Sequence, residues 1–154
     1  MSHIGNGAYW LCECECGTIR PVAAQSLKNG TSISCGCLGN SKGEQIIKDI
    51  LDKNFINYET EKTFSSCRFP KTNYFARFDF FVENKYLIEF DGEFHFHETS
   101  GWNTEERFQK TQERDAYKNQ WCKENNIPLI RIPYTHLNDL CIEDLLLETS
   151  KFII

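Results

Sequence analysis

Apolar and polar residues alternate with the two-residue period of β-strands through the middle of the chain. Residues 58–64 and 76–82 show this alternation, and Glu83-Asn84-Lys85 predicts a tight turn after the second run because asparagine tolerates positive φ. In the next strand, residues 86–97, the apolar row consists of Ile88, Phe90, Phe94 and Phe96. The polar row between them consists of Glu89, Asp91, Glu93, His95 and His97. One face of this predicted strand therefore carries all of its ionisable groups.

Helical spacing is present on both sides of these strands. Ile46, Ile47, Ile50 and Leu51 follow the capping-box sequence Ser41-Lys42-Gly43-Glu44, which predicts a helix over 42–54. A long helix is expected from about residue 104 to 125, an apolar strand over 128–133, and a last helix from about residue 142 to 152. This order of elements predicts an α/β domain with a mixed central sheet flanked by helices.

Residues 1–40 have a different character, because cysteine and glycine are concentrated there. Of the 8 cysteines, five lie within residues 12–37: Cys12, Cys14, Cys16, Cys35 and Cys37. In a reducing compartment this clustering favours a metal over disulfides, and the adjacent glycines let closely spaced thiolates converge on one tetrahedral zinc ion. Cys14, Cys16, Cys35 and Cys37 are the first choice of ligands, although Cys12 could replace Cys14. We therefore expect a zinc-ribbon module over 1–40 and a second domain over 41–154; the alternative is a set of reduced thiols without metal.

Length and composition limit the possible functions. A chain of 154 residues and 18.0 kDa accommodates one domain of ordinary size and one small module. No apolar run approaches the roughly 18 residues of a membrane span, and the first residues lack the features of a signal peptide, so a cytoplasmic protein is expected. The other cysteines, Cys67, Cys122 and Cys141, are expected to be small buried hydrophobic residues. The net charge of −5 argues against nucleic-acid binding, because non-specific affinity comes from neutralising phosphates.

The predicted hairpin brings carboxylates together. If the turn is centred on Asn84, Asp79 lies across from Glu89, with β-carbons about 5 Å apart. Asp91 lies on the same face as Glu89. Carboxylates this close repel one another, and a divalent cation such as Mg²⁺ or Mn²⁺ would neutralise them. The alternative is a charged, solvent-exposed outer face of an antiparallel sheet.

Four other ionisable residues have positions that suit such a site. His95 and His97 fall where a histidine could activate water or protonate a leaving oxygen, and His95 is nearer the carboxylates. Asp115 lies on the apolar face of its helix, which either an active-site role or an ion pair in the core would explain. Glu44 lies at the edge of the apolar face of the first helix, where a capping role is the alternative.

The residues of this predicted site resemble a known group of nucleases. The resemblance rests on the segments Phe78-Asp79-Phe80, Ile88-Glu89-Phe90-Asp91-Gly92-Glu93-Phe94-His95, Arg114-Asp115 with Lys118-Asn119, and Leu129-Ile130-Arg131-Ile132-Pro133. It covers about residues 41–135 and is to the restriction-endonuclease-like (PD-(D/E)XK) superfamily, in the branch of very-short-patch-repair and phage homing endonucleases with an E, D, H, D signature. The Cys-rich module similarly resembles the small ribbons beside phage nuclease domains, which are regarded as nucleic-acid-binding.

The resemblance implies a metal-dependent endonuclease that hydrolyses phosphodiester bonds in double-stranded DNA, encoded by a phage or another mobile element. It assigns the E, D, H, D signature to Glu44, Asp79, His95 and Asp115. Asp79, with Glu89 or Asp91, would hold Mg²⁺ or Mn²⁺, and His95 would handle the proton of the water or the leaving group.

One residue departs from the commonest pattern of the superfamily. The E-x-K motif would place lysine at position 91, where this chain has Asp91. The expectation from sequence is therefore that the lysine-based mechanism is excluded and that the histidine variant operates.

Acids that bind metal reduce the conflict between the net charge and DNA binding, and local basic groups could contact the phosphates. These groups are Lys42, Arg68, Lys71, Arg77, Arg107, Lys110, Arg114 and Lys118. Two chains could act together as a homodimer. The main alternative is a noncatalytic zinc-ribbon DNA-binding protein on an inactive nuclease scaffold, and a more distant one is a nuclease that acts on RNA.

Overall fold

The computed structural model describes residues 2–3, 8–14, 19–32, 35, 42–92 and 104–154. The chain divides into two compact units, residues 1–39 and residues 40–154. The division falls where the Cys-rich sequence gives way to the helical pattern that begins near Ser41. Glu93, His95 and His97, together with Cys16 and Cys37, lie outside the described residues.

The first unit contains a small antiparallel sheet. Its strands are β1 (Ser2–His3), β2 (Ala8–Glu13) and β3 (Ile19–Ala23), in the order β1-β2-β3, and a short helix α1 (Ala24–Lys28) follows. None of the residues described in this unit is buried, and Tyr9, Trp10 and Leu11 are exposed. Burial of these residues therefore contributes little hydrophobic stabilisation to the unit.

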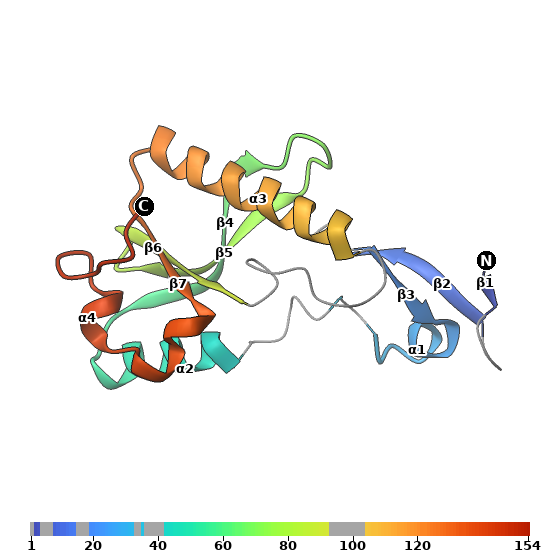
Figure 1. Ribbon diagram of the computed structural model, residues 1–154, viewed down its shortest axis with the longest axis horizontal. Helices are drawn as coiled ribbons and strands as arrows, with labels where there is room; N and C mark the ends of the chain where they lie inside the picture. Colours follow the sequence, from blue (N-terminus) through green and yellow to red (C-terminus); the bar gives the residue numbers. More distant parts are fainter. Residues whose placement is uncertain (1, 4–7, 15–18, 33–34, 36–41, 93–103) are drawn as a thin grey trace. The chain divides into compact units, whose positions relative to one another are not determined.

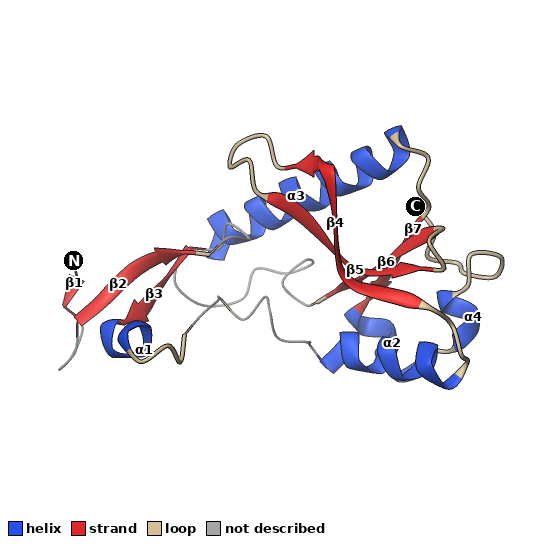
Figure 2. Cartoon of the chain, turned by 180° about the vertical axis from the view of Figure 1, so that it is seen from behind, coloured by secondary structure: helices blue, strands red, loops and turns tan. Residues whose placement is uncertain are grey.

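The second unit is a mixed α/β structure around a four-stranded sheet. The strands β4 (Tyr58–Arg68), β5 (Phe75–Val82), β6 (Tyr86–Asp91) and β7 (Leu129–Pro133) lie in the order β4-β5-β6-β7. The first three are antiparallel neighbours, whereas β7 is parallel to β6. A parallel pair needs a crossover, which α3 (Thr104–Glu124) provides. Figure 1 and Figure 2 show α3 on one side of the sheet, with α2 (Lys42–Lys53) and α4 (Ile142–Leu145) on the other.

The hairpin between β5 and β6 has the register that the sequence predicts. Glu83 and Asn84 adopt positive φ, and the Lys85 N–H donates to the Val82 carbonyl at 2.9 Å. Val82 consequently pairs with Tyr86, the arrangement expected of a turn centred on Asn84. The strand predictions for 76–82 and 128–133 and the helix predictions for 42–54 and 104–125 are each confirmed to within one residue at either end.

Two hydrophobic clusters hold helices against the two faces of the sheet. The cluster on the α2 and α4 side contains Ile47, Leu51, Phe80, Val82, Tyr86, Ile88, Ile130, Ile132 and Leu145. The cluster on the α3 side contains Cys67, Ala76, Phe78, Leu87, Trp121, Cys122 and Leu129. Because both faces are covered, β6 and β7 are buried on both sides, as parallel strands usually are.

The C-terminal region differs from the sequence prediction. The predicted helix over 142–152 is wrong in length, since α4 ends at Leu145 and Leu146 has extended geometry. The last residues instead pair with β7: the Arg131 N–H donates to the Phe152 carbonyl, and the Ile154 N–H donates to the Leu129 carbonyl, both at 3.0 Å. Covering the otherwise open edge of β7 satisfies backbone groups that a continued helix would leave unpaired.

One element was not predicted, and one further local prediction needs correction. Residues 134–139, which carry no clear sequence pattern, form a 3₁₀ helix, η2 (Tyr134–Asp139). Cys67 and Cys122 are buried as expected, but Cys141 is exposed. Cys141 begins α4, where its backbone N–H and its thiol both donate to Asp144 at 3.2 Å. Cys141 therefore occupies the N-cap position of α4, with the Asp144 carboxylate as the acceptor, and is not a core residue.

No helix among the residues that the structure describes is both long enough and apolar enough to cross a membrane.

Close packing of α2 on β6 depends on a glycine. Gly43, in the first turn of α2, is buried, and a β-carbon at this position would overlap the ring of Phe90. The helix therefore approaches the strand more closely than any other residue would allow. The neighbouring Glu44 lies near enough to β5 for its charge to act on Asp79.

A Gly43→Ala substitution tests this contact, because helix propensity and overlap with Phe90 predict opposite effects on the free energy of unfolding. Helix propensity alone predicts that alanine stabilises the protein by up to about 1 kcal/mol. Overlap with Phe90 instead predicts a loss of about 1–3 kcal/mol in the free energy of unfolding, measured by urea denaturation of the whole chain. In a Phe90→Ala background the same substitution should be neutral or stabilising. A destabilisation that persists in that background would contradict the contact.

Candidate functional site

Asp79 lies where β5 and β6 stop pairing. The register runs from Val82 opposite Tyr86 to Phe80 opposite Ile88, and ends there although both strands continue. Beyond this point the Phe90 N–H donates a hydrogen bond of 2.8 Å to the Asp79 carboxylate. A carboxylate oxygen of Asp79 thus accepts a hydrogen bond from a backbone N–H of β6, just beyond the last residue pair of β5 and β6.

The direction of β5 changes at the same residue. Phe80 packs in the cluster under α2, whereas Phe78, two positions earlier, packs in the cluster under α3, with its ring 6.0 Å from that of Trp121. A flat strand would keep both rings on one face, so twisting of β5 separates them. The change of direction leaves Asp79 partly buried at the end of the paired region.

Glu89 faces α3 and is neutralised by a lysine from that helix. Its side chain is 4% exposed, and Lys118 Nζ lies 2.8 Å from Glu89 Oε1 with a side chain that is 13% exposed. The lysine also lies over the Phe78 ring, 5.1 Å from its centroid. Two unit charges about 4 Å apart attract by about 4 kcal/mol at an effective dielectric constant of about 20, which offsets part of the cost of burying them.

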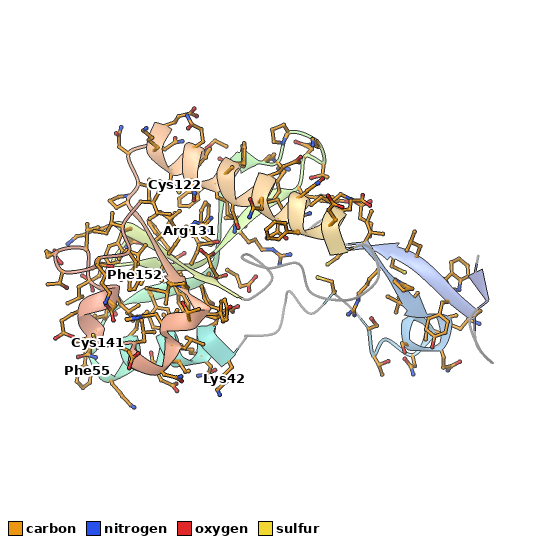
Figure 3. All side chains as sticks on the ribbon, viewed as in Figure 1. Lys42, Phe55, Cys122, Arg131, Cys141 and Phe152 are labelled. Carbon is orange, nitrogen blue, oxygen red and sulfur yellow. The ribbon has the colours of Figure 1, made fainter. Side chains whose placement is uncertain are left out.

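Arg131 joins β6, β7 and α3 through a second set of contacts. Its guanidinium lies 2.6 Å from Asp91 Oδ1 and 3.4 Å from Asp115 Oδ1. The Nε atom donates to the Asn119 side chain at 2.8 Å, and the Glu89 carboxylate is 3.9 Å away. Figure 3 labels Arg131 on the side of the sheet that α3 covers. The parallel register places Arg131 beside Glu89 on the neighbouring strand.

The pKa values of Asp79 and Lys118 are both raised, but for different reasons. Burial raises the pKa of Asp79 well above its ordinary value of 3.8, and the negative charges of Glu89 and Glu44 add to the shift. The Lys118 charge and the Phe90 N–H act in the opposite direction without offsetting it. For Lys118 itself, burial acts to lower the pKa, but the Glu89 and Asp79 carboxylates outweigh it and the pKa is raised. The lysine therefore stays protonated at neutral pH.

The raised pKa of Asp79 has a consequence for stability. Above pH 3.8 the unfolded chain has released this proton while the folded, metal-free protein still holds it. The free energy of unfolding therefore falls as pH rises from 3.8 towards the folded pKa. A cation that binds the Asp79 carboxylate would remove this penalty.

The structure brings together most of the acids that the sequence singles out. Glu89 and Asp91 are buried under α3, so the alternative of a solvent-exposed acidic face is wrong for these two residues. Asp115 reaches the same place and makes the ion pair with Arg131 that was one of its two explanations. Glu44, partly buried on α2, is close enough for its charge to affect Asp79. His95 cannot be placed, because it lies outside the described residues.

Sequence reasoning missed the roles of Lys118 and Arg131. Lys118 was grouped with the basic residues that could contact DNA, and the aspartate at position 91 was taken to exclude the lysine-based mechanism. A lysine nevertheless reaches Glu89 from α3, a distant part of the chain, so the aspartate at position 91 does not by itself keep lysine away from these acids. An arginine within the apolar segment 129–133 was the available signal for Arg131, since a buried arginine requires acidic partners.

The other basic residues expected to contact DNA have varied surroundings. Arg77 pairs with Glu61 at 3.4 Å, Lys110 with Glu106 at 2.8 Å, and Lys71 with Glu113 at 2.7 Å. Arg68 and Arg114 lie over the rings of Phe75 and Phe69, 3.7 and 5.4 Å from the centroids. Lys42 is exposed at the start of α2, and the Arg107 side chain lies outside the description. In the first unit, Cys12, Cys14 and Cys35 are half-buried.

Three acids of the site have the spacing of a metal centre. One carboxylate oxygen each from Glu89, Asp91 and Asp115 lies within 4.8 Å of the others. Oxygen donors of this kind suit Mg²⁺ and Mn²⁺. With Asp79 on one side and Lys118 and Arg131 among them, the arrangement can bind a divalent cation and stabilise negative charge beside it.

Comparisons of the chain with protein-family models, with curated proteins and with solved structures found no match.

Replacing Lys118 with methionine should expose the cost of burying Glu89. The substitution keeps the length of the side chain but removes the ammonium, and the free energy of unfolding should fall by about 3 kcal/mol or more. Lys110→Met is a matched control on the same helix, because Glu106 is largely exposed, and it should cost less than about 1 kcal/mol. Adding Glu89→Gln to Lys118→Met should recover much of the loss. Equal effects of the two lysine substitutions in urea denaturation would argue against a buried ion pair.

Proposed function

We propose that residues 40–154 form a metal-dependent DNA endonuclease with a restriction-endonuclease-like fold. The observation that carries the proposal is the meeting of Asp79, Glu89 and Lys118 at the point where β5 and β6 separate. The mixed sheet flanked by helices agrees with the architecture that the resemblance implies.

The residues of the site fit a divalent cation. Asp79, with Glu89 or Asp91, supplies hard oxygen ligands, and the penalty for ionising Asp79 in the folded protein would be relieved by a bound cation. When bound there, Mg²⁺ or Mn²⁺ would polarise a phosphate. Lys118 would stabilise negative charge beside Glu89, and His95 remains our proposed group for handling the proton of the water or the leaving oxygen.

The acid content of this cluster is high for a purely structural role. A noncatalytic DNA-binding protein on the same scaffold would gain only the hydrogen bond from the Phe90 N–H to Asp79, whose raised pKa makes the folded, metal-free protein less stable at neutral pH. Residues that reduce stability in this way are typical of functional sites. This argument favours the nuclease over the noncatalytic alternative.

Cleavage of plasmid DNA tests the proposal directly. The full chain should nick or cut supercoiled plasmid in Mg²⁺ or Mn²⁺, and Asp79→Ala should slow cleavage by at least about a hundredfold, since a bound metal contributes several kcal/mol to the transition state. Asp139→Ala changes an exposed carboxylate on η2 and should leave the rate unchanged. His95→Ala should also slow cleavage.

Two results would reject parts of this proposal. Wild-type protein that cuts no DNA with either metal would favour the noncatalytic alternative. Faster cleavage of RNA than of DNA, with both offered in the same assay, would show that the substrate is RNA.

We also propose that residues 1–40 form a zinc ribbon that binds DNA. The unit has little hydrophobic burial among its described residues, and small units of this kind usually need a metal to fold. Four of Cys12, Cys14, Cys16, Cys35 and Cys37 would hold the zinc ion.

Metal analysis of the purified chain should find about one zinc ion per molecule. Cys35→Ser should lose this zinc, because it removes a proposed ligand. Cys141→Ser should keep it, because Cys141 belongs to α4 and serine is a good helix cap. Wild-type protein that is fully folded without zinc would refute the ribbon.

A further inference from the structure

The chain leaves helix α2 through a Schellman motif, in which one residue after the helix adopts positive φ. The Ile56 N–H donates to the Leu51 carbonyl at 3.1 Å. The Phe55 N–H donates to the Asp52 carbonyl, also at 3.1 Å. Phe55 is the residue with positive φ, at 56°. Glycine is usual at this position, because a β-carbon is strained there.

Helix α3 ends in the same motif with a different residue at its centre. The Ile127 N–H donates to the Cys122 carbonyl at 3.0 Å, and Asn126, with φ of 55°, takes the position that Phe55 has after α2. The tripeptide is Asn-Phe-Ile after α2 and Asn-Asn-Ile after α3. Asparagine tolerates the left-handed conformation better than most residues with a side chain do. The second motif therefore shows which residue suits this backbone when only the fold matters.

The ring of Phe55 makes little contact with the rest of the chain. Phe55 is 93% exposed, whereas the next residue, Ile56, packs in the cluster under α2. A single exposed apolar residue is ordinary on a protein surface. An exposed ring on a strained backbone is less ordinary, because it combines two unfavourable features that asparagine avoids. Such a combination favours a role in binding over a role in folding.

Phe55 is remote from the cluster of acids. Glu44, whose charge acts on Asp79, is in the first turn of α2. Phe55 follows the last turn, roughly 16 Å farther along the helix axis. Figure 3 labels Phe55 and Lys42 at opposite ends of this helix. A partner that contacts Phe55 therefore does not need to cover the candidate site.

Charged residues of both signs surround Phe55. The turn between β5 and β6 adjoins the segment that follows it, because the Glu83 N–H donates to the Asn57 carbonyl at 2.9 Å. The Asn57 N–H in turn donates to the Glu83 carboxylate at 3.4 Å. Two acids and two lysines, all exposed, form a rim around the ring: Asp52, Lys53, Glu83 and Lys85.

The balance of charge in this rim indicates the kind of partner. A surface without net charge does not attract phosphate, which argues against DNA. A surface of one sign would be repelled by a copy of itself. With both signs present, the acids of one copy can face the lysines of another across a two-fold axis, and two-fold contacts are the commonest in homo-oligomers.

We propose that Phe55 is the central contact of a two-fold interface between two copies of this chain. The two rings meet near the axis, and the acids of each rim face the lysines of the other. Aromatic residues at the centre of an interface, within a polar rim, typically carry much of the binding energy. The surface is small, so the dimer is weak and depends on protein concentration. This inference does not rest on the proposed nuclease activity.

Sedimentation velocity of the full chain in a reducing buffer tests the interface. Wild-type protein should show a reversible dimer whose share rises with concentration across the micromolar range. Phe55→Asn should weaken dimerisation by at least about tenfold, and Phe55→Tyr, which keeps a ring, should retain it. Wild-type protein that stays monomeric throughout this range overturns the inference.

Thermal unfolding measures the strain separately from the interface. At a concentration where wild-type protein is monomeric, Phe55→Asn should raise Tm by roughly 2–4 °C, because it relieves strain and loses few contacts. Asn126→Phe should lower Tm, because it places a ring on the equivalent backbone after α3. A monomeric Phe55→Asn protein that is less stable than wild type would show that the ring supports the fold, and would contradict the inference.

A combined variant separates a specific interface from general adhesion of an exposed ring. Protein with both Phe55→Asn and Asn126→Phe carries the ring on the same motif but at the end of α3, and should stay monomeric. Recovery of the dimer in this variant overturns the inference.

The rim is tested by reversing its lysines. Lys53→Glu combined with Lys85→Glu leaves only acids in the rim and should prevent dimerisation, and added salt should partly restore it by screening the repulsion. Unchanged dimerisation would contradict the proposed two-fold contact.

Binding of a double-stranded DNA oligonucleotide tests the other possible partner. At a concentration where both proteins are monomeric, wild type and Phe55→Asn should bind DNA equally. A loss of DNA affinity in Phe55→Asn, with sedimentation unchanged, would assign Phe55 to a DNA contact and overturn the inference.

Discussion

Buried negative charge is the constraint on which the arrangement of residues 40–154 depends. Glu89 and Asp91 are under 10% exposed, and a carboxylate in such a place is tolerated only with a cation or several donors beside it. Lys118 and Arg131 supply these cations from α3 and β7. Helix, parallel strand and acidic strand are therefore held together by charge as well as by the apolar clusters. Removing one charge while leaving its partner would cost more than removing both.

The topology explains how these cations reach the acids. β7 is parallel to β6, so Arg131 lies beside Glu89, and the crossover helix α3 passes over the same face. Asp115 and Lys118 are three residues apart on that helix and both reach the cluster, as residues on one helix face do. Asp79 approaches from β5, where that strand leaves the ladder. Segments that are far apart in the sequence thus meet at the end of the short paired region of β5 and β6.

Local patterns in the sequence were enough to predict the strands, the hairpin and the long helices. They were not enough to predict which basic residues neutralise the buried acids. Alternation and the Asn84 turn predicted the hairpin, and with it the approach of Asp79 to Glu89, because both depend on neighbouring residues. The partners Lys118 and Arg131 depend on the phase of a long helix and on the register of a parallel pair, neither of which a local pattern determines. The C-terminal helix was predicted too long for a similar reason, since its end depends on contacts with a distant strand. Residues 146–154 are apolar enough for a helix, but the open edge of β7 offers their backbone hydrogen bonds.

Part of the net negative charge of the chain lies in the buried cluster around Glu89, and the rest lies elsewhere in the chain. The formal charges of Asp79, Glu89, Asp91 and Asp115 with Lys118 and Arg131 sum to −2 of the net charge of −5, and the nearby Glu44 adds one more negative charge. The rest of the chain remains acidic, so any affinity for DNA must come from where positive charge lies and not from its total. Arg77, Lys110 and Lys71 each have an acid within 3.4 Å, which weakens their local field. Arg68 and Arg114 instead have aromatic rings beside them, and a ring does not neutralise the charge that it contacts.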